Sequence, residues 1–349
     1  MALLFMDGFD HYNPISYGYT KWDSNAPNGV DASYSHPAGR VNPNGGWIYV
    51  SNQSEFYWTK TLDGNYSTLI IGMGLVFGMQ DGGSDVYFLA VYDGSTVQVG
   101  LRRNRTTGYI EAYRGDGTLL GTYQVAFSRD VWYHVELKAT IHPSAGVLQF
   151  RVNEFLAIDL SGINTRNSSH SYANKFGIGT NYHRMHGIDD LYVCDDSGSE
   201  NNDFLGDCRI DTVLPSGAGN YSQWTPSAGS NYQCVDDALF DGGTDYVSAA
   251  TVGSKDSYAC GNLPAGVSDI KALQVNVLAK RSDTAVITKV KPLVRIDGTD
   301  HEQAETTLGI SYTDVRAVLE TNPDTGLQWE KTDVDNAEFG QVLTYNPLP

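Results

Sequence analysis

The sequence predicts an all-β protein with two domains, the first of them a β-sandwich. Its 349 residues include 37 Gly and 22 Tyr but only 5 Met, and 18% are charged. This composition suits short strands joined by tight turns. Apolar and polar residues alternate over short segments that recur about every 8–12 residues between Gly, Asp and Asn turns, which is typical of a sandwich. The length allows about two domains, each with its own core.

The strands expected in the first half follow one another closely. The first spans residues 3–10 and turns at Asp7-Gly8, and residues 11–46 then form a long loop rich in Tyr, Asn, Pro and Gly. Asp93-Gly94-Ser95 and Gly115-Asp116-Gly117 predict hairpin turns. The other expected strands are residues 47–50, 55–58, 67–77, 86–92, 97–102, 109–114, 119–125, 132–138, 147–152, 155–160 and 188–193.

The stretch 187–203 predicts a domain boundary. Ile188, Leu191 and Val193 alternate with polar neighbours and indicate a strand. The run that follows is acidic and polar with no apolar side chain before Phe204, which is typical of a linker. We therefore expect a β-sandwich over residues 1–196, a linker over 197–207 and a β-rich domain over 208–349.

The second half predicts a β-rich domain with one short helix near its end. Helix signals cluster at residues 331–339, where Thr332 caps the helix, an apolar stripe ends at Phe339 and Gly340 stops it. Arg209 to Pro215 opens the domain. The expected strands are residues 238–240, 245–250, 257–260, 270–278, 286–296, 305–311 and 315–320.

The first half resembles the concanavalin A-like lectin/glucanase jelly roll, including its laminin G-like branch. The resemblance covers about residues 1–195 and is carried by strand order and by three segments: 132–137, 146–153 and 188–193. In that family the first and last strands lie side by side. The resemblance therefore implies that residues 7–10 lie beside residues 188–191.

A second resemblance covers nearly the whole chain. The segments Asn201–Asp207, Leu214–Asn220, Gln223–Pro226 and Asn322–Trp329 resemble structural proteins of tailed bacteriophages. Those proteins join an N-terminal lectin-like sandwich to a C-terminal half of this kind. The resemblance implies a virion component, and it leaves open whether the chain belongs to the tail or to the head.

The net charge of the chain limits the classes of partner that we expect. The chain has 41 Asp and Glu against 23 Lys and Arg, a net charge of −18, which repels phosphate backbones and argues against nucleic acid. We interpret the basic cluster Arg102-Arg103-Asn104-Arg105 as a solvated hairpin end. No run of about 18 apolar residues occurs, so we expect no membrane insertion.

We expect the protein to be made in a bacterial cytoplasm and released by lysis as part of a virion. The N-terminus has no basic region, and its apolar run is too short for a signal peptide. The four cysteines, at positions 194, 208, 234 and 260, match no zinc pattern, and we expect free thiols. We expect other virion proteins as partners and a homo-oligomer, with a trimer as one candidate.

The spacing of the acidic residues argues against catalytic activity. Glucanases of the jelly-roll family carry paired carboxylates as Glu-x-Asp-x-Glu on one strand, and this triplet does not occur. Glu136 stands alone on its strand. Asp189 and Asp190 are adjacent, so alternation predicts that they point to opposite faces. His134 lies within an alternating strand and is interpreted as a packing residue.

Two kinds of binding site remain candidates. Calcium prefers clustered oxygen ligands, and adjacent first and last strands would bring Asp7 and Asp10 close to Asp189 and Asp190. Acidic turns without metal are the commoner case, so the expected cofactor is none, with calcium as the alternative. Exposed aromatic rings beside polar side chains are typical of carbohydrate or partner contacts. The candidates for such contacts are Tyr17, Tyr19, Trp22, Tyr34, Trp58, Tyr182 and Arg184.

The resulting hypothesis is a non-enzymatic structural component of a tailed-phage virion. It would be a tail, baseplate or fibre appendage whose lectin-like domain contacts host-surface glycans. The alternative is a capsid decoration protein that binds the major capsid protein. A third hypothesis, from another class, is a polysaccharide-degrading enzyme on a glucanase-like fold.

Overall fold

The computed structural model divides the chain into two compact units, residues 1–211 and residues 212–349. The residues that it describes are 2–11, 21–23, 32–35, 40, 47–50, 55–77, 87–181, 185–240, 242–282, 284 and 287–345. Residues 32–35, 47–50, 55–57, 180–181 and 185–186 among these are described by their backbone alone.

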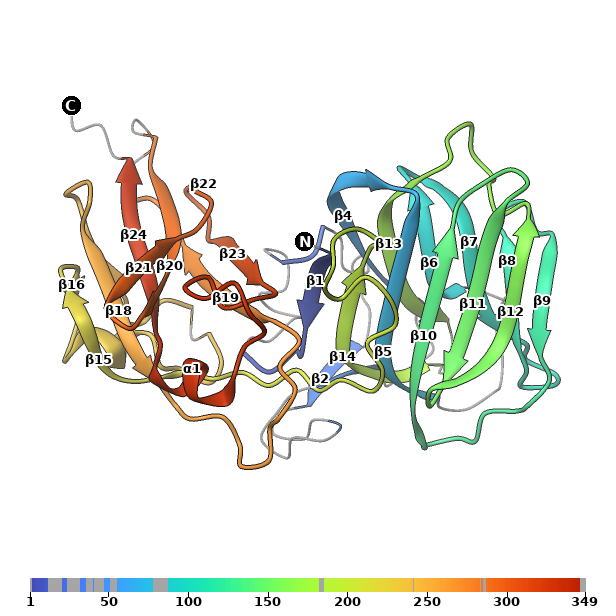
Figure 1. Cartoon of the computed structure of the whole chain (residues 1–349), viewed down its shortest axis with the longest axis horizontal. Coiled ribbons are helices and arrows are strands. Elements are labelled where there is room, and N and C mark those ends of the chain that lie inside the picture. The colour runs from blue at the N-terminus through green and yellow to red at the C-terminus, as the bar shows by residue number, and fades with distance from the viewer. Residues whose placement is uncertain are drawn as a thin grey trace. The chain divides into compact units, whose positions relative to one another are not determined.

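Unit 1 is a jelly-roll sandwich of two antiparallel sheets (Figure 1). Sheet A has the order β12-β11-β10-β5-β14-β3-β2, with β1 also paired to β14, and sheet B has the order β4-β13-β6-β7-β8-β9. The strands are β1 Leu3–Asp7, β2 Ala32–Ser35, β3 Trp47–Val50, β4 Glu55–Tyr66, β5 Thr68–Phe77, β6 Tyr87–Asp93, β7 Thr96–Arg103, β8 Ile110–Arg114, β9 Leu119–Tyr123, β10 Trp132–Thr140, β11 Gly146–Val152, β12 Phe155–Ile163, β13 Ala173–Asn181 and β14 Met185–Cys194.

The core of unit 1 lies between these two sheets. Alternate residues of each strand point inward because successive side chains of a strand lie on opposite faces. On β5, Ile71, Met73 and Leu75 are fully buried in the core, whereas Gly72 and Gly74 between them lie on the opposite face of the sheet. The expected all-β sandwich is confirmed, and most expected strands are present. β2 and β13 were not expected.

The first and last strands of the sandwich are neighbours, as the family resemblance implied. β1 pairs antiparallel with β14, and Asp7 lies opposite Leu191. Residues 197–211, which the sequence assigned to a linker and to the start of the second domain, belong to unit 1. They belong there because their side chains and backbone make hydrogen bonds with sheet A, as described below.

Unit 2 is β-rich with one short α-helix, as expected. Its main sheet, sheet C, has the order β15-β18-β24-β20-β21, with β22 paired to β20, and two small sheets pair β16 with β17 and β19 with β23. The strands are β15 Pro215–Ser222, β16 Thr225–Pro226, β17 Val247–Ser248, β18 Lys255–Cys260, β19 Leu273–Ala279, β20 Lys289–Ile296, β21 Thr299–Glu302, β22 Thr306–Thr307, β23 Thr313–Leu319 and β24 Glu338–Tyr345.

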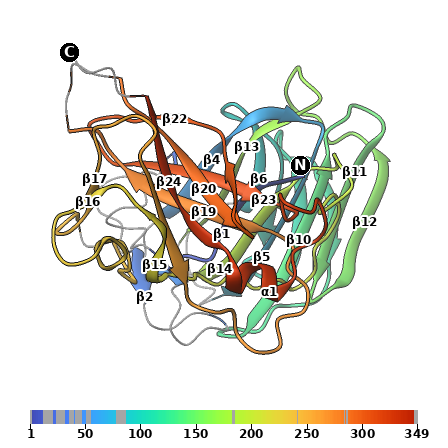
Figure 2. The same ribbon diagram turned by 60° about the vertical axis from the view of Figure 1, so that its left-hand side comes forward.

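The helix of unit 2 is shorter than the sequence predicted. Helix α1 spans Lys331–Asn336 and directly precedes β24 (Figure 2). Its N-cap is Glu330 rather than Thr332, and Phe339 belongs to β24. A 3-10 turn spans Asn231–Cys234, where no regular structure was expected. No helix in the described part of the chain is long and apolar enough to cross a membrane.

Candidate functional site

Two adjacent aspartates lie where β14 changes its partner on one edge. β14 pairs with β3 before Asp189 and with β1 after Asp190. The register against β5 shifts between Asp189 and Tyr192, and Asp190 has a φ of 52°, so the chain forms a β-bulge here. The bulge interrupts the alternation of side chains. The prediction that the two carboxylates point to opposite faces is therefore wrong, because both contact Arg40.

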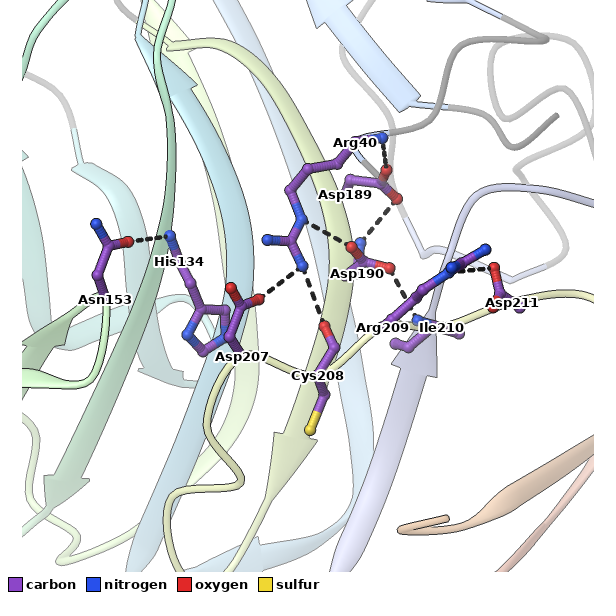
Figure 3. Close-up of polar contacts among 10 residues, drawn as sticks. All are labelled: Arg40, His134, Asn153, Asp189, Asp190, Asp207, Cys208, Arg209, Ile210 and Asp211. Carbon is purple, nitrogen blue, oxygen red and sulfur yellow. Dashed lines mark hydrogen bonds and ion pairs between the residues drawn. The ribbon is translucent and has the colours of Figure 1, made fainter. Parts of the chain in front are cut away.

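Arg40 is the centre of this polar cluster (Figure 3). Its backbone N–H donates to Asp189 Oδ2 at 2.6 Å and its Nε to Asp190 Oδ2 at 2.8 Å. Its Nη2 donates to Asp207 Oδ1 at 2.8 Å and to the Cys208 carbonyl at 3.1 Å. Burial lowers the pKa of Arg40, but the contacts with Asp207 and Asp190 outweigh burial and raise it. Arg40 is therefore a buried, fully charged cation.

Residues 203–210, which we call the strap, contact the outer face of sheet A. Most of these contacts are made with side chains of sheet A or with the side chain of Arg40. The strap is therefore bound to the sheet. Besides the contacts with Arg40, two side-chain contacts join the strap to sheet A: Asp203 with Lys138 at 3.0 Å and the Phe204 ring with Arg151 at 4.9 Å. Three backbone N–H groups of the strap donate to side chains of sheet A: Leu205 to Tyr192 at 3.1 Å, Gly206 to Glu136 at 2.9 Å and Ile210 to Asp190 at 2.8 Å.

Glu136 is fully buried under the strap. Its Oε1 accepts hydrogen bonds from the Tyr192 hydroxyl and from the Gly206 N–H, and its Oε2 lies 3.0 Å from Arg151 Nη1. Burial and the neighbouring Glu136 raise the pKa of Tyr192, which holds the phenol in its neutral form. The Glu136 carboxylate thus joins β14, β11 and residues 203–210 through three contacts.

His134 lies beside Glu136 on the same face and is 2% exposed. Its backbone N–H donates to Asn153 Oδ1 at 2.9 Å, while neither ring nitrogen has a hydrogen-bond partner among the described residues. Burial lowers the pKa of His134, against the opposite effect of Glu136 and Asp207. The ring stacks with Tyr192 at 6.4 Å between centroids, which agrees with the expected packing role.

Asp189 makes the stability of unit 1 depend on pH. Burial, followed by the charges of Asp190 and Asp10, raises the pKa of Asp189 to about 8. The folded chain therefore binds a proton that the unfolded chain has released, so stability falls as pH rises through this range. We expect the free energy of unfolding to be about 1 kcal/mol lower at pH 8.5 than at pH 7. His134 contributes little to this difference, because it is largely neutral in both the folded and the unfolded chain at pH 7 and above.

Urea unfolding at the two pH values measures this difference. Asp189→Asn removes the titrating group, so the variant should lose that part of the pH dependence, and the comparison with wild type cancels other groups such as the cysteines. An equal pH dependence in wild type and variant contradicts the assignment.

Gly72 makes room for the Tyr192 ring. A Cβ at position 72 would lie 2.2 Å from that ring. We expect Gly72→Ala to displace Tyr192 and to destabilise unit 1 by about 1–3 kcal/mol, measured by urea unfolding. Gly217→Ala, on β15 of unit 2, controls for the glycine-to-alanine change in a strand, because a Cβ there meets nothing closer than 3.8 Å. Equal effects of the two substitutions would show that Tyr192 is not fixed over Gly72.

The four aspartates predicted as calcium ligands do not form one cluster. Asp7 pairs with Lys21 Nζ at 3.1 Å and accepts hydrogen bonds from the Trp22 indole and the Phe9 N–H. Asp190 pairs with Arg40. The charge of Asp10 contributes to the raised pKa of Asp189. Protein cations thus neutralise two of the four carboxylates, and no group of three or more His, Cys, Asp or Glu in the described ranges could hold a metal.

The aromatic residues predicted for carbohydrate contact fall into two groups. Trp22 and Trp58 are each only 2% exposed and pack in the core at 5.3 Å between ring centroids, so their prediction as sugar contacts is wrong. The Trp22 ring packs beside Phe5 and Phe176, and the Trp58 ring packs beside Phe9 and Trp22. Tyr17, Tyr19, Tyr182 and Arg184 lie outside the described residues, and Tyr34 is described by its backbone only.

Most of the residues that build this site were not among the predicted site residues. Tyr192 and Arg151 alternate with core residues on β14 and β11, and this pattern places them on an outer face. The sequence around Arg40 and around Asp207 does not reveal their pairing, because the two residues are 167 positions apart. The assembled site holds charges in fixed pairs and fastens the strap. Its exposed carboxylates, Asp203 and Asp207, are paired with Lys138 and Arg40.

No protein-family model and no curated protein matches the sequence. Solved structures similar to part of the chain include the cellulose-induced protein Cip1, at 13% identity and a TM-score of 0.39, covering 52% of this chain and 95% of that one. Domain 4 of the arabinanase AbnA from Geobacillus stearothermophilus is similar at 12% identity and a TM-score of 0.39, covering 56% and 94%. A galectin-like protein of unknown function from Bacillus subtilis is similar at 10% identity and a TM-score of 0.39, covering 56% and 96%.

Proposed function

We propose that the protein is a non-enzymatic structural component of a tailed-phage virion. Unit 1 is the outward-facing, lectin-like part that contacts host-surface glycans, and unit 2 anchors the chain in a multi-copy tail or baseplate appendage. The observation that carries the structural role is the strap, because it occupies the face of sheet A on which Glu136 lies and uses the charges there for its own attachment.

The state of the carboxylates supports a role without catalysis. Most glycoside hydrolases use two carboxyl groups that flank the scissile bond, about 5–9.5 Å apart. Glu136 is fully buried and bound to Tyr192, Gly206 and Arg151. Asp190 is bound to Arg40 and to the strap. A sugar would have to displace the strap before it reached either group.

The virion assignment is supported by the resemblance of residues 201–226 and 322–329 to tailed-phage structural proteins. The net charge of −18 also fits a crowded, multi-copy protein, because like charges keep the unassembled copies apart in solution.

Antibody labelling of intact particles in negative stain tests the assignment. We expect label on the tail or baseplate. Label over the capsid faces would replace the tail assignment by a decoration protein bound to the major capsid protein, and unlabelled particles would overturn the virion assignment. A reducing-sugar assay with host-surface polysaccharide tests the absence of catalysis, and release of sugar above the background of a heat-denatured sample would contradict it.

A further inference from the structure

Arg102 lies on the outer face of sheet B, at the centre of three neighbouring strands. It is opposite Tyr87 on β6 and Glu111 on β8, and β7 lies between these two strands (Figure 1). Val99 and Leu101 on β7 point into the core, so Arg102 points away from it. The basic cluster that the sequence suggested is thus divided, because Arg103 is buried and donates to the Phe127 carbonyl.

Two tyrosine rings hold the Arg102 guanidinium. Its Cζ lies 4.1 Å from the centroid of the Tyr87 ring and 4.6 Å from that of the Tyr113 ring. The Tyr87 ring covers the backbone of Gly100, where a Cβ would lie 2.4 Å from the ring. Stacking of this kind orients a guanidinium group that would otherwise sample many rotamers.

Arg102 has no carboxylate partner among the described residues. Glu111 is opposite in register, but its Oε1 accepts from the Asn104 side chain and its Oε2 from the Tyr113 hydroxyl. The Nε of Arg102 is buried and has no hydrogen-bond partner in the part of the chain that the structure describes. An oriented cation without a carboxylate is unexpected in a chain with 41 acidic residues, in which Arg40, Arg114 and Arg151 all form ion pairs.

We propose that Arg102, Tyr87 and Tyr113 form a binding subsite for the carboxylate of an acidic sugar. A guanidinium group matches a carboxylate through two parallel hydrogen bonds, and the two tyrosine rings that stack on Arg102 hold its guanidinium plane in place for such a pair. This inference rests on the proposed contact of unit 1 with host-surface glycans. It adds the location of the contact and the class of the ligand, a glycan that contains uronic acid or another carboxylated sugar.

Binding of trigalacturonate and of neutral galactotriose to the full chain tests the subsite, because these probes differ only in their carboxylates. We expect wild type to bind trigalacturonate at least tenfold more tightly than galactotriose, measured by calorimetry. Arg102→Gln should lose that preference, and Arg102→Lys should lose part of it because an ammonium group cannot form the two parallel hydrogen bonds. Arg105→Gln removes an equal charge from the exposed turn nearby and should leave the affinity within twofold.

The outcomes separate this inference from the proposed function. Failure of wild type to bind trigalacturonate, equal binding of the two sugars, or full binding by a folded Arg102→Gln variant overturns the subsite. Particle labelling decides the virion assignment independently of these results. Trigalacturonate binding that depends on Arg102 supports the subsite whether or not the particles are labelled.

Discussion

Replacing Arg40 with Met should lower the free energy of unfolding of unit 1 by about 3–5 kcal/mol, because removal of one partner leaves a buried charge uncompensated. The side chains of Arg40 and Asp190 are 8% and 4% exposed. Met preserves much of the volume of Arg40 but cannot donate to Asp190, Asp207 or the Cys208 carbonyl. The substitution should therefore also release the strap.

Urea unfolding and hydrogen exchange together measure both effects. We expect backbone amides of the strap, such as those of Leu205 and Gly206, to exchange faster in Arg40→Met even under conditions in which the chain remains folded. Arg209→Met is the matched control, since its side chain is 37% exposed and its pair with Asp211 should contribute less than about 1 kcal/mol. Equal stability and equal exchange in the two variants would contradict the central role of Arg40.

Replacing Trp22 with Ala should also destabilise unit 1 by about 3–5 kcal/mol, because it removes a large core side chain. The Trp22 ring packs against Phe5 at 5.1 Å and Phe176 at 5.6 Å, and its indole N–H donates to Asp7. The substitution therefore opens a cavity and takes one hydrogen-bond donor from a buried carboxylate.

Thermal unfolding followed by circular dichroism checks this expectation. Tyr246→Ala serves as a control, because Tyr246 is 52% exposed and its loss should change stability by less than about 0.5 kcal/mol. A Trp22→Ala variant that kept the stability of wild type and lost glycan binding alone would restore Trp22 as a sugar contact and contradict its place in the core.

The sequence predicted the sandwich well because its signals are local. Alternation marks β10 and β11, and Asp93-Gly94-Ser95 marks the turn between β6 and β7. β13 was missed because Gly177 and Gly179 interrupt its apolar pattern, although Phe176 and Ile178 are in the core. Its pairing with β4 and β6 overrides the weak strand propensity of glycine.

The site was less predictable because its contacts are polar and distant in sequence. Residues 203–207 look like a linker, since their acidic and small side chains suit solvent as well as a charged surface. Only the positions of Lys138 and Arg40 in the fold show that Asp203 and Asp207 are bound. The bulge at Asp190 also has no local signal, because it arises where β14 pairs with both β1 and β3. Trp22 and Trp58 stand among other aromatic and polar residues in the sequence, a pattern that suggests exposed loops. Tertiary packing nevertheless buries both rings.

Quantitative mass spectrometry of purified phage particles tests the proposed function most directly. Phage particles are purified from a lysate of the cells that produce the protein. Peptides from residues 87–181 and 287–345 are then quantified relative to peptides of the major capsid protein. A tail or baseplate appendage predicts both sets of peptides in equal amounts, at a fixed low multiple per particle. Absence of both sets from particles that contain all other structural proteins would contradict the assignment.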